Sequence, residues 1–476
     1  MPKQKQLSNQ DRDGTRSACC PIVGIGASAG GLAAFKTFFA QMPNDSGLAF
    51  VLVPHLDPSH QSLMVELLTR QTQMPVHEVT DDMVIEKNHV YIIPPAKYLS
   101  LDKGKLRLSD PPPQSRIDTA IDHFLRSLAE DQQERAIGIV LSGTSSHGTL
   151  GLQAIKASGG VAIAQKPDTA EYDSMPQNAI DTGIVDYILP PEEMPATLIK
   201  YAQHAYVSGA WESLEPAKTD LEQLDRLLRL LKARTRYDFR NYRKNMVMRR
   251  VRRRMGLNQI DDLADYSEFL RNDPDEAKSL FRDMLIGVTG FFREPEAFRV
   301  LEQHVLPQWA IRDDSEGPVR VWIPGCSTGE EAYSIAMTLI EQFPESQENL
   351  NLQIFATDID EVALKIARQG RYPLSIAADI TPERLQSFFT QTGSYYQVNE
   401  RVRELVVFAA QNLISDAPFS KLDLISCRNL LIYLEPEVQQ KVISLFHFAL
   451  NENGYLLLGA SESIGRNTDL FETVSK

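Results

Sequence analysis

The fold is decided most clearly by the stretch Val321-Trp322-Ile323-Pro324-Gly325-Cys326-Ser327-Thr328-Gly329-Glu330-Glu331. An apolar run ends at Pro324, a turn of small residues follows, and a helical pattern continues from Glu330 to Gln342. This order predicts a buried strand, a tight glycine loop and a helix N-terminus, which together commonly hold a nucleotide-like cofactor. An ordinary strand-to-helix turn would share the pattern, and a phosphate-binding P-loop is not expected because no Lys follows Gly329.

The next apolar run strengthens the case for a cofactor. It covers residues 352–356 and ends in Thr357-Asp358-Ile359-Asp360. A carboxylate at the tip of the second strand is where the hydroxyl groups of a ribose would be hydrogen-bonded. The glycine loop and Asp358 together therefore favour a cofactor that contains adenosine.

Apolar runs alternate with helical patterns in the first part of the chain as well. Such alternation predicts a mostly parallel sheet with helices on both faces. The predicted strands cover 22–25, 49–53, 90–93, 137–141, 161–164 and 184–188, and the predicted helices cover 32–42, 63–70, 117–132 and 149–157.

The segment between the two alternating parts has helical patterns and no convincing strands. The predicted class is therefore α/β, with two doubly wound, mostly parallel sheet domains separated by a small helical domain. Two strand-like runs, 394–398 and 404–408, predict a small inserted sheet near 370–408. The predicted segments are a disordered lead-in (1–20), a first sheet domain (21–205), a linker (206–220), a helical domain (221–308) and a second sheet domain (309–476).

Composition narrows the class of protein. The 476 residues are 43% hydrophobic and 24% charged, as in a globular protein, and the net charge of -14 argues against a general nucleic-acid binder. The four cysteines, Cys19, Cys20, Cys326 and Cys427, suggest neither a disulfide framework nor a zinc site, so no metal is expected and a reducing cytoplasm fits. No apolar run approaches membrane-spanning length, so membrane insertion is not expected.

A second glycine-rich turn, Gly24-Ile25-Gly26-Ala27-Ser28-Ala29-Gly30-Gly31, follows the first predicted strand. A dinucleotide-binding loop would require an acid after the next strand, but that strand ends in Val53-Pro54-His55. A Ser and a His at neighbouring strand tips instead suit a nucleophile and its base, with loop amides available to stabilise an oxyanion. A buried structural role for His55 is the alternative.

Six motifs occur in order over 21–199: the Ser28 turn, Pro54-His55, Met74-Pro75-Val76, Tyr91-Ile92-Ile93-Pro94-Pro95, Leu141-Ser142-Gly143-Thr144 and Ser174-Met175-Pro176. With these motifs, the first part of the chain resembles the chemotaxis receptor methylesterase domain (CheB-type). The resemblance implies hydrolysis of glutamyl methyl esters, and often deamidation of glutamine, by a Ser-His-Asp triad. Ser28 would be the nucleophile and His55 the base.

The third member of that triad does not carry over. Where the family has an Asp in a Gly-Thr-Gly-Ser-Asp-Gly type of turn, this chain reads Gly143-Thr144-Ser145-Ser146-His147-Gly148. Loss of the orienting carboxylate in a comparable triad costs about four orders of magnitude in rate. We therefore expect an esterase half that is strongly weakened, or that has become a binding module, unless a neighbouring acid replaces the missing one.

A basic segment lies in the helical middle of the chain. Residues 232–254 contain eleven Lys or Arg and one acid, Asp238, while an apolar stripe (Met246, Val247, Val251, Met255) predicts a helix with a dense basic face. A solvated charged face and a nucleic-acid surface are two interpretations. An acidic protein partner is the third, and a carboxylate-rich substrate favours it.

Five motifs follow one another in the rest of the chain: Phe291-Phe292-Arg293, the glycine loop, Ala356–Asp360, Asn412-Leu413 and Cys427-Arg428-Asn429-Leu430-Leu431-Ile432-Tyr433. With these motifs, the chain from Leu221 onward resembles the chemotaxis receptor glutamate methyltransferase (CheR-type). Methyltransferases of exocyclic amines commonly carry adjacent prolines at this last strand tip, and none occur here. The fold of such enzymes normally continues with one more antiparallel strand, so we expect the natural chain to extend beyond Lys476.

The resemblance implies S-adenosyl-L-methionine as cofactor. The matched cofactor-site positions are Thr289, Arg293, Glu330, Asp358, Asn412, Leu413, Cys427 and Arg428. Tyr433 would lie near the reacting methyl group, and Arg293 and Tyr433 are the candidates for positioning the acceptor. Gly287 stands where the family often has Asn. The predicted function is methylation of glutamate side chains on a methyl-accepting chemoreceptor or a similar acidic helical signalling protein, with a signalling scaffold and a nucleic-acid methyltransferase as alternatives.

Overall fold

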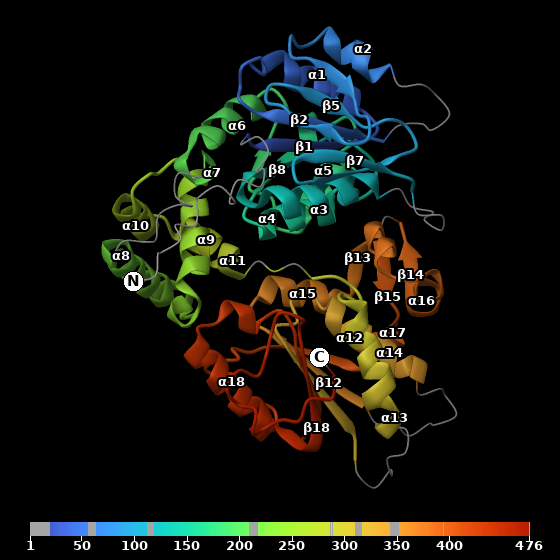
Figure 1. Ribbon diagram of the computed structural model, residues 1–476, viewed down its shortest axis with the longest axis vertical. Helices are drawn as coiled ribbons and strands as arrows, with labels where there is room; N and C mark the ends of the chain where they lie inside the picture. The colour runs from blue at the N-terminus through green and yellow to red at the C-terminus, as the bar shows by residue number, and fades with distance from the viewer. Residues whose placement is uncertain are drawn as a thin grey trace, which may run out of the picture. The chain divides into compact units, whose positions relative to one another are not determined.

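The structure is a computed structural model that divides into two compact units. Unit 1 comprises Met1–Glu215 with Met255–Asp261, and unit 2 comprises Pro216–Arg254 with Asp262–Lys476 (Figure 1). The residues that the structure describes are 20–55, 63–111, 119–208, 218–285, 287, 289–309, 317–342, 352–393 and 395–475.

Unit 1 is built on a seven-stranded sheet in which all neighbouring strands are parallel. The predicted parallel sheet is therefore confirmed. In order across the sheet, the strands are β10 (Tyr187–Leu189), β9 (Val161–Gln165), β8 (Ala136–Val140), β1 (Ile22–Ala27), β2 (Ala49–Pro54), β5 (Val90–Ile92) and β3 (Val76–Glu78).

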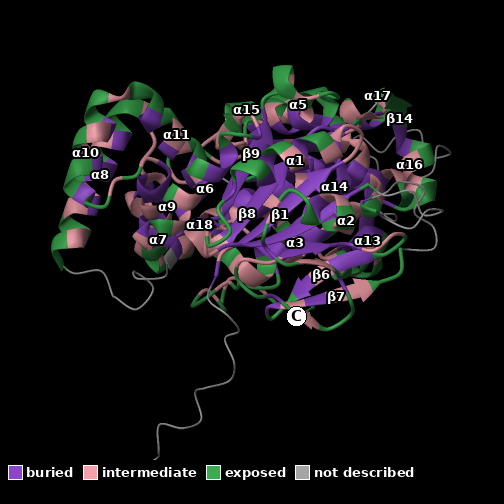
Figure 2. Ribbon diagram, turned by 90° about the horizontal axis from the view of Figure 1, so that it is seen from above, coloured by how far each residue is buried: buried purple, intermediate pink, exposed green. Residues whose placement is uncertain are grey.

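Alternate residues of each strand enter separate cores on the two faces of this sheet. In β1, Val23 and Ile25 pack in one core with α1 (Gly31–Gln41) and α6 (Met194–Gln203), whereas Ile22 packs in the other. The second core contains α3 (Ala120–Gln132) and α4 (Thr149–Ala157), and Figure 2 shows the strands β8 and β1 as buried. The fold is thus doubly wound, because helices cover both faces.

Glycine in β1 allows one of these helices to approach closely. A Cβ added at Gly24 would lie 2.8–2.9 Å from side-chain atoms of Phe124, Leu125 and Leu128 on α3. The helix therefore packs directly on the backbone of β1, the strand that leads to Ser28.

Several elements of unit 1 were not predicted from the sequence. They are short and only partly apolar, so they lack the periodicity on which such predictions depend. They include a small antiparallel sheet made of β4 (Met83–Val84), β7 (Lys105–Ser109) and β6 (Tyr98–Asp102), together with α5 (Ser174–Asp181), α7 (Ala205–Ser208) and the 3-10 turns Gln133–Arg135 and Pro167–Thr169. The predicted helix 63–70 is present as α2 (Met64–Thr69).

The middle of the chain is helical, as predicted, and contains no strand among its described residues from 218 to 309. Its helices are α8 (Lys218–Thr235), α9 (Lys244–Leu257), α10 (Leu263–Asn272), α11 (Pro274–Leu285), α12 (Pro295–Val300) and α13 (Leu306–Trp309), with a 3-10 turn at Phe239–Asn241 and a π-helical turn at Leu301–Val305.

The predicted apolar stripe of α9 is confirmed, but the prediction of a dense basic face is wrong in part. Val247 and Val251 are buried, and so are Arg250 and Arg253. Arg253 forms an ion pair with Asp283 of α11, and Arg254 Nε donates to Glu276 Oε1 at 2.9 Å. Acids on a neighbouring helix thus neutralise part of the basic segment inside the fold.

Replacing Asp283 by alanine is expected to destabilise unit 2 by about 3–5 kcal/mol, because it leaves the guanidinium of Arg253 buried without its carboxylate. The side chains of Arg253 and Asp283 are only 0% and 1% exposed. Scanning calorimetry should show a lower unfolding temperature for this variant. Asp275→Ala, which removes an exposed ion pair with Lys278, is the matched control and should change the transition little.

Unit 2 contains a five-stranded parallel sheet, which confirms the second predicted α/β region. Its order is β16 (Val406–Ala410), β12 (Leu352–Asp358), β11 (Val319–Pro324), β17 (Leu422–Cys427) and β18 (Leu450–Leu458). The connecting helices are α14 (Glu330–Gln342), α15 (Glu361–Gln369) and α18 (Pro436–Ala449). The fully buried Trp322 packs edge-on against Phe446 of α18 and donates Nε1–H to Thr357 Oγ1 at 2.9 Å.

The predicted insertion forms a three-stranded antiparallel sheet, but with a different set of strands. The run 394–398 supplies β15 (Tyr395–Val398), which pairs with β13 (Arg371–Pro373) and β14 (Phe389–Thr392). The run 404–408 was wrongly assigned, because it becomes β16 at the edge of the main sheet, where Val406 aligns with Ile354. The 3-10 turn Leu374–Ala378, α16 (Pro382–Phe388) and α17 (Glu400–Arg403) complete the insertion.

Among the residues that the structure describes, no helix is long and apolar enough to cross a membrane. Within the same ranges, no three His, Cys, Asp or Glu side chains are grouped so that they could hold a metal ion.

Two candidate active sites

The first candidate site lies where β1 and β2 end side by side. The parallel register pairs Ala27 with Pro54, so Ser28 and His55 follow at adjacent strand tips. Ser28 Oγ lies 3.5 Å from His55 Nδ1, and the backbone N–H of His55 donates to Ala27 O at 2.9 Å. The pair has the arrangement of a nucleophile and its base, with a separation at the long limit of a hydrogen bond.

The loop after β8 supports the turn that carries Ser28. The N–H of Ser28 donates to Ser142 O at 3.0 Å, and Ser142 Oγ donates to Ala29 O at 2.9 Å. Gly30 has a φ of 75°, and a Cβ there would lie 2.6 Å from Ser142 Oγ. Both the left-handed backbone and the close approach therefore require glycine at this position.

His147 lies beside His55, as expected from its place in the sequence. The two imidazole rings are 6.0 Å apart between centroids and tilted by 47°, and His147 is buried. Ser28, His55 and His147 are therefore brought together, with a second imidazole where the resemblance leads one to expect a carboxylate.

A buried acid that interacts electrostatically with His147 was not predicted from the sequence. Asp122 of α3 accepts the N–H of Gly148 through Oδ2 at 3.0 Å and the N–H of Gly151 through Oδ1 at 2.8 Å. Burial raises the pKa of Asp122, an effect partly offset by these hydrogen bonds and by the charges of Arg126 and His147. An isolated acid on the otherwise apolar face of a predicted helix was the signal that could have revealed it.

The second candidate site is formed around the glycine loop that follows β11. The N–H groups of Gly325 and Cys326 donate to Thr357 O at 2.7 and 3.0 Å, and that of Ser327 donates to Asp358 Oδ2 at 2.8 Å. Gly329 has a φ of 94°, and a Cβ there would lie 2.9 Å from Ala367. The loop is thus folded onto the tip of β12, as the strand-loop-helix pattern predicts.

A cavity opens at these strand tips, with about 1130 Å³ of space that includes some open solvent. Seven residues expected at the transferase site line this cavity: Thr289, Arg293, Asp358, Asn412, Leu413, Arg428 and Tyr433. Gly287 lines it as well.

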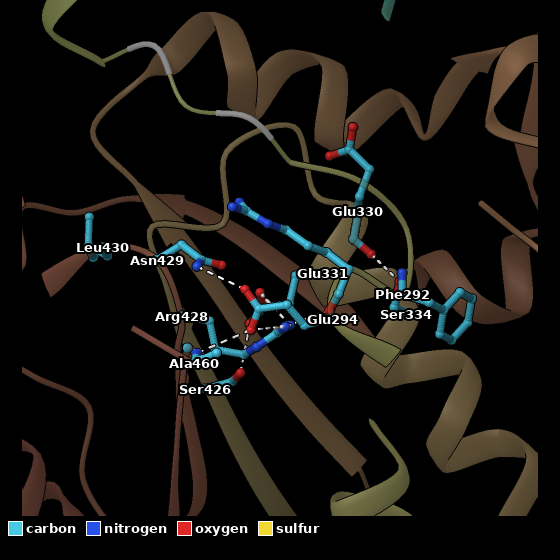
Figure 3. A network of polar contacts seen from close by, with 12 residues as sticks. Phe292, Glu294, Glu330, Glu331, Ser334, Ser426, Arg428, Asn429, Leu430 and Ala460 are labelled. Carbon is cyan, nitrogen blue, oxygen red and sulfur yellow. Dashed lines mark hydrogen bonds and ion pairs between the residues drawn. The ribbon is translucent and has the colours of Figure 1, made fainter. Parts of the chain in front are cut away.

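Two other expected residues do not line the cavity. The carboxylate of Glu330 accepts hydrogen bonds from Thr328 Oγ1 at 2.6 and 2.9 Å, and Cys427 is fully buried at the end of β17. Glu331 lines the cavity instead, and it accepts from Ser426 Oγ at 2.6 Å. Consecutive helical residues point about 100° apart, so only one glutamate of the pair can face the cavity. Figure 3 shows Glu330 extending away from Glu331 and Arg428.

Arg428 is the centre of a buried polar network at one wall of the cavity (Figure 3). Its Nη2 donates to Arg293 O at 2.5 Å and to Glu294 Oε2 at 3.3 Å, and its Nη1 donates to Glu331 Oε2 at 3.3 Å. Burial raises the pKa of Glu331, with Arg428 and Ser426 opposing the rise. The network joins the segment that carries Arg293 to the tip of β17.

Glu294 completes this network from the other side. It accepts from Asn429 Nδ2 at 3.1 Å and from the N–H of Ala460 at 3.2 Å. Burial opposes ionisation of Glu294, but these hydrogen bonds and the charge of Arg428 hold its pKa below the usual range.

The helical middle also contributes to the cavity, which the sequence analysis did not predict. Tyr242 precedes α9, and Met246 and Arg250 lie on its first turns; all three line the cavity. Burial, with a contribution from the charge of Asp358, raises the pKa of Tyr242 to about 12. The apolar stripe that includes Met246 predicted a buried face of the helix. The stripe did not indicate that this face would line the cavity.

Replacing Glu330 by glutamine is expected to remove a pH-dependent destabilisation of unit 2. Burial raises the pKa of Glu330 from 4.5 to about 7, so the folded state favours the protonated acid. Wild-type stability should therefore fall as pH rises from about 4.5 to about 7, by up to about 3 kcal/mol. Thermal unfolding across this pH range should show the variant gaining stability relative to wild type as pH rises. The same substitution at the exposed Glu361 is the control, and a parallel profile for Glu330→Gln and wild type would contradict the prediction.

Comparisons with known proteins match both units of the chain. Residues 23–198 match the family model of the CheB methylesterase, 222–285 match the all-alpha domain of the CheR methyltransferase, and 287–476 match its SAM-binding domain. A chemotaxis protein methyltransferase of Vibrio parahaemolyticus is 40% identical over 195 residues, which cover 40% of this chain and 70% of that relative. The chain belongs to the chemotaxis protein methyltransferase family. A CheB methylesterase domain precedes the CheR domains in the same chain.

Other relatives extend the match. The putative methyltransferase Cher3 of Pseudomonas putida is 33% identical over 270 residues, covering 54% of this chain and 95% of that relative. An uncharacterized 104.1 kDa protein of Rhodobacter capsulatus is 38% identical over 436 residues, which cover 87% of this chain. Those residues make up 45% of that relative, so this chain spans less than half of its length. The catalytic domain of the Thermotoga maritima CheB methylesterase is similar in structure, with a TM-score of 0.37 and 28% identity over 38% of this chain and 98% of that one.

The residues of the cavity fit S-adenosylmethionine, the cofactor of the CheR domain. Its lining combines the carboxylates of Glu331 and Asp358, suited to a sulfonium and to hydroxyl or amino donors, with the guanidinium groups of Arg293 and Arg428, suited to a carboxylate. The side-chain oxygen Oε1 of Gln411 is buried and has no hydrogen-bond partner within the part of the chain that the structure describes. An acceptor left open in this way fits a ligand that carries an amino or hydroxyl group.

Proposed function

We propose that unit 2 transfers a methyl group from S-adenosylmethionine to glutamate side chains of a chemoreceptor-like, acidic helical protein. The observation that carries the proposal is the single cavity that gathers Thr289, Arg293, Asp358, Arg428 and Tyr433 in a chain of the CheR family. The family accounts for the cofactor, and the guanidinium of Arg293 suits an acceptor that carries a negative charge.

The chemistry requires positioning rather than proton transfer. When bound, S-adenosylmethionine supplies an activated methyl group. A glutamate carboxylate is already ionised at neutral pH and needs no general base, so the chain has only to align the acceptor and exclude water. Arg293 and Tyr433 are the proposed positioning groups for the acceptor. Arg428 is held in place by Glu294 and Glu331, and its own hydrogen bond to Arg293 O fixes the backbone at that residue.

For unit 1 we propose a methylesterase whose activity is strongly weakened. Ser28 would attack the ester carbonyl, and His55 would take its proton. With His147 in the position of the family's Asp, that position supplies no carboxylate to stabilise the imidazolium of His55 as it forms. A domain that binds methylated or unmethylated receptor segments without turnover is the second candidate, and this same substitution favours it.

Transfer to nucleic acid is the least favoured function. Its support in the sequence was the basic segment 232–254, but Arg253 and Arg254 are engaged in ion pairs with Asp283 and Glu276. We further propose a location in the cytoplasm, where S-adenosylmethionine and the signalling domains of receptors would be accessible.

Binding and transfer experiments test these proposals together. Isothermal titration calorimetry should show one S-adenosylmethionine site per chain. Tritium from the labelled methyl group should then appear in receptor signalling-domain fragments and not in DNA or RNA. Binding without transfer to any fragment would favour the scaffold, and label in nucleic acid would overturn the assignment.

A further inference from the structure

One carboxylate outside the cavity accepts an unusual number of backbone hydrogen bonds. Glu462 follows β18, and its two oxygens accept five N–H groups. Oε1 accepts those of Leu430 at 2.9 Å, Leu431 at 2.6 Å and Ile432 at 3.3 Å, and Oε2 accepts those of Asn429 at 2.7 Å and Gly459 at 2.9 Å.

Four of these N–H groups belong to the turn that follows β17. This turn contains Asn429, whose φ is 57°, and continues into a 3-10 turn over Leu431–Tyr433. N–H groups at the start of a helical turn lack partners within the turn and need an acceptor from elsewhere. Glu462 supplies that acceptor from a segment some thirty residues further along the chain.

The same turn forms part of the cavity wall. Arg428, Asn429, Leu430 and Tyr433 all line the cavity, whereas Glu462 does not. The two ends of the turn thus depend on different acids. Glu294 contacts Arg428 and the side chain of Asn429, and Glu462 holds the backbone that leads to Tyr433.

We propose that Glu462 is a positioning residue of the methyltransferase, which sets the place of Arg428 and Tyr433 without touching cofactor or acceptor. The expected loss of turnover rests on the proposed function, whereas the expected effect on the turn after β17 does not. A misplacement of about 1 Å in a group that aligns reactants can reduce turnover about 100-fold.

Glutamine cannot reproduce this arrangement although it has the same shape. Two carboxylate oxygens can each accept from several donors, whereas an amide presents one accepting oxygen and one NH2 group. In Glu462→Gln, either the Asn429 and Gly459 N–H groups or those of Leu430 to Ile432 would face a donor. The local geometry leaves little room for adjustment, since a Cβ at Gly459 would lie 2.8 Å from Glu462 Oε2.

The test compares Glu462→Gln with wild type and with Glu452→Gln, which makes the same change at an exposed position of β18. Amide hydrogen exchange at 429–432 should be at least about 10-fold faster in Glu462→Gln, while exchange in β11 stays as in wild type. The turnover number for methyl transfer should fall about 100-fold. The Km for the receptor fragment should change much less than turnover, and the control should match wild type.

Gly459→Ala is a second variant, which displaces the carboxylate while keeping its charge, and it should change exchange and turnover in the same direction. Unchanged exchange at 429–432 in a folded Glu462→Gln protein, or turnover within twofold of wild type, would overturn the inference. If wild type transfers no methyl group at all, the proposed function fails, and the exchange data still decide whether Glu462 holds the turn.

Discussion

Replacing His147 by aspartate is expected to raise hydrolysis of glutamyl methyl esters by unit 1, by up to about 10⁴-fold. In the wild-type site, the ring beside His55 is another imidazole, 6.0 Å away between centroids. An imidazole carries no negative charge with which to stabilise His55 as it takes the proton of Ser28. The substitution would supply this charge at a position that the loop after β8 already places beside His55.

Release of methanol from a methylated receptor fragment measures this gain, with His147→Asn as the uncharged control. Ser28→Ala added to His147→Asp should abolish the activity gained. Asp122→Asn tests the alternative that Asp122 already takes the place of the missing triad acid. If wild type hydrolyses the ester at a substantial rate and Asp122→Asn does not, this alternative holds. A His147→Asp protein no faster than wild type would contradict the assignment of His147 to the place of the missing acid.

Replacing Arg293 by alanine is expected to reduce methyl transfer to a receptor fragment about 100- to 1000-fold, the cost typical of losing one preorganised charged donor in an enclosed site. Arg293 lines the cavity, and Arg428 donates a hydrogen bond to its backbone carbonyl, so the fold sets the position of its backbone. The neighbouring Phe292 and Phe298 rings pack 5.2 Å apart between centroids and further restrict this segment.

Steady-state transfer of labelled methyl groups measures the effect. Arg299→Ala is the matched control, because Arg299 is an exposed arginine of α12 that forms an ion pair with Glu296 of the same helix. Tyr433→Phe distinguishes hydrogen bonding by the phenol from packing of its ring, since only the hydroxyl is lost. Full transfer by Arg293→Ala would remove Arg293 from the site.

The site residues that could be predicted from sequence are those that lie at the tips of parallel strands. An apolar run that ends in a small or polar residue gives both the strand and the position of its tip, and neighbouring tips lie at one edge of the sheet. Ser28 with His55, and the Gly325 loop with Asp358, were found in this way, and the structure brings each pair together.

Features that depend on tertiary contacts could not be predicted. Nothing local in Glu330-Glu331 reveals which carboxylate faces the cavity, because that depends on the rotation of α14 about its axis. The burial of Arg253 depends on Asp283, which lies thirty residues away. Asp122 and Glu462 act on backbone groups of distant loops, so no motif or spacing connects them to their sites.

The central claim is that unit 2 forms methyl esters on carboxylates, and the stability of the product bond tests it most directly. Receptor fragment labelled by this protein with tritiated S-adenosylmethionine should be treated with mild alkali, and volatile tritium should be counted. A carboxyl methyl ester hydrolyses under these conditions, so the account predicts release of nearly all the label as methanol. Label that remains bound to the fragment after alkali would show methylation of nitrogen or another atom, and would contradict the account.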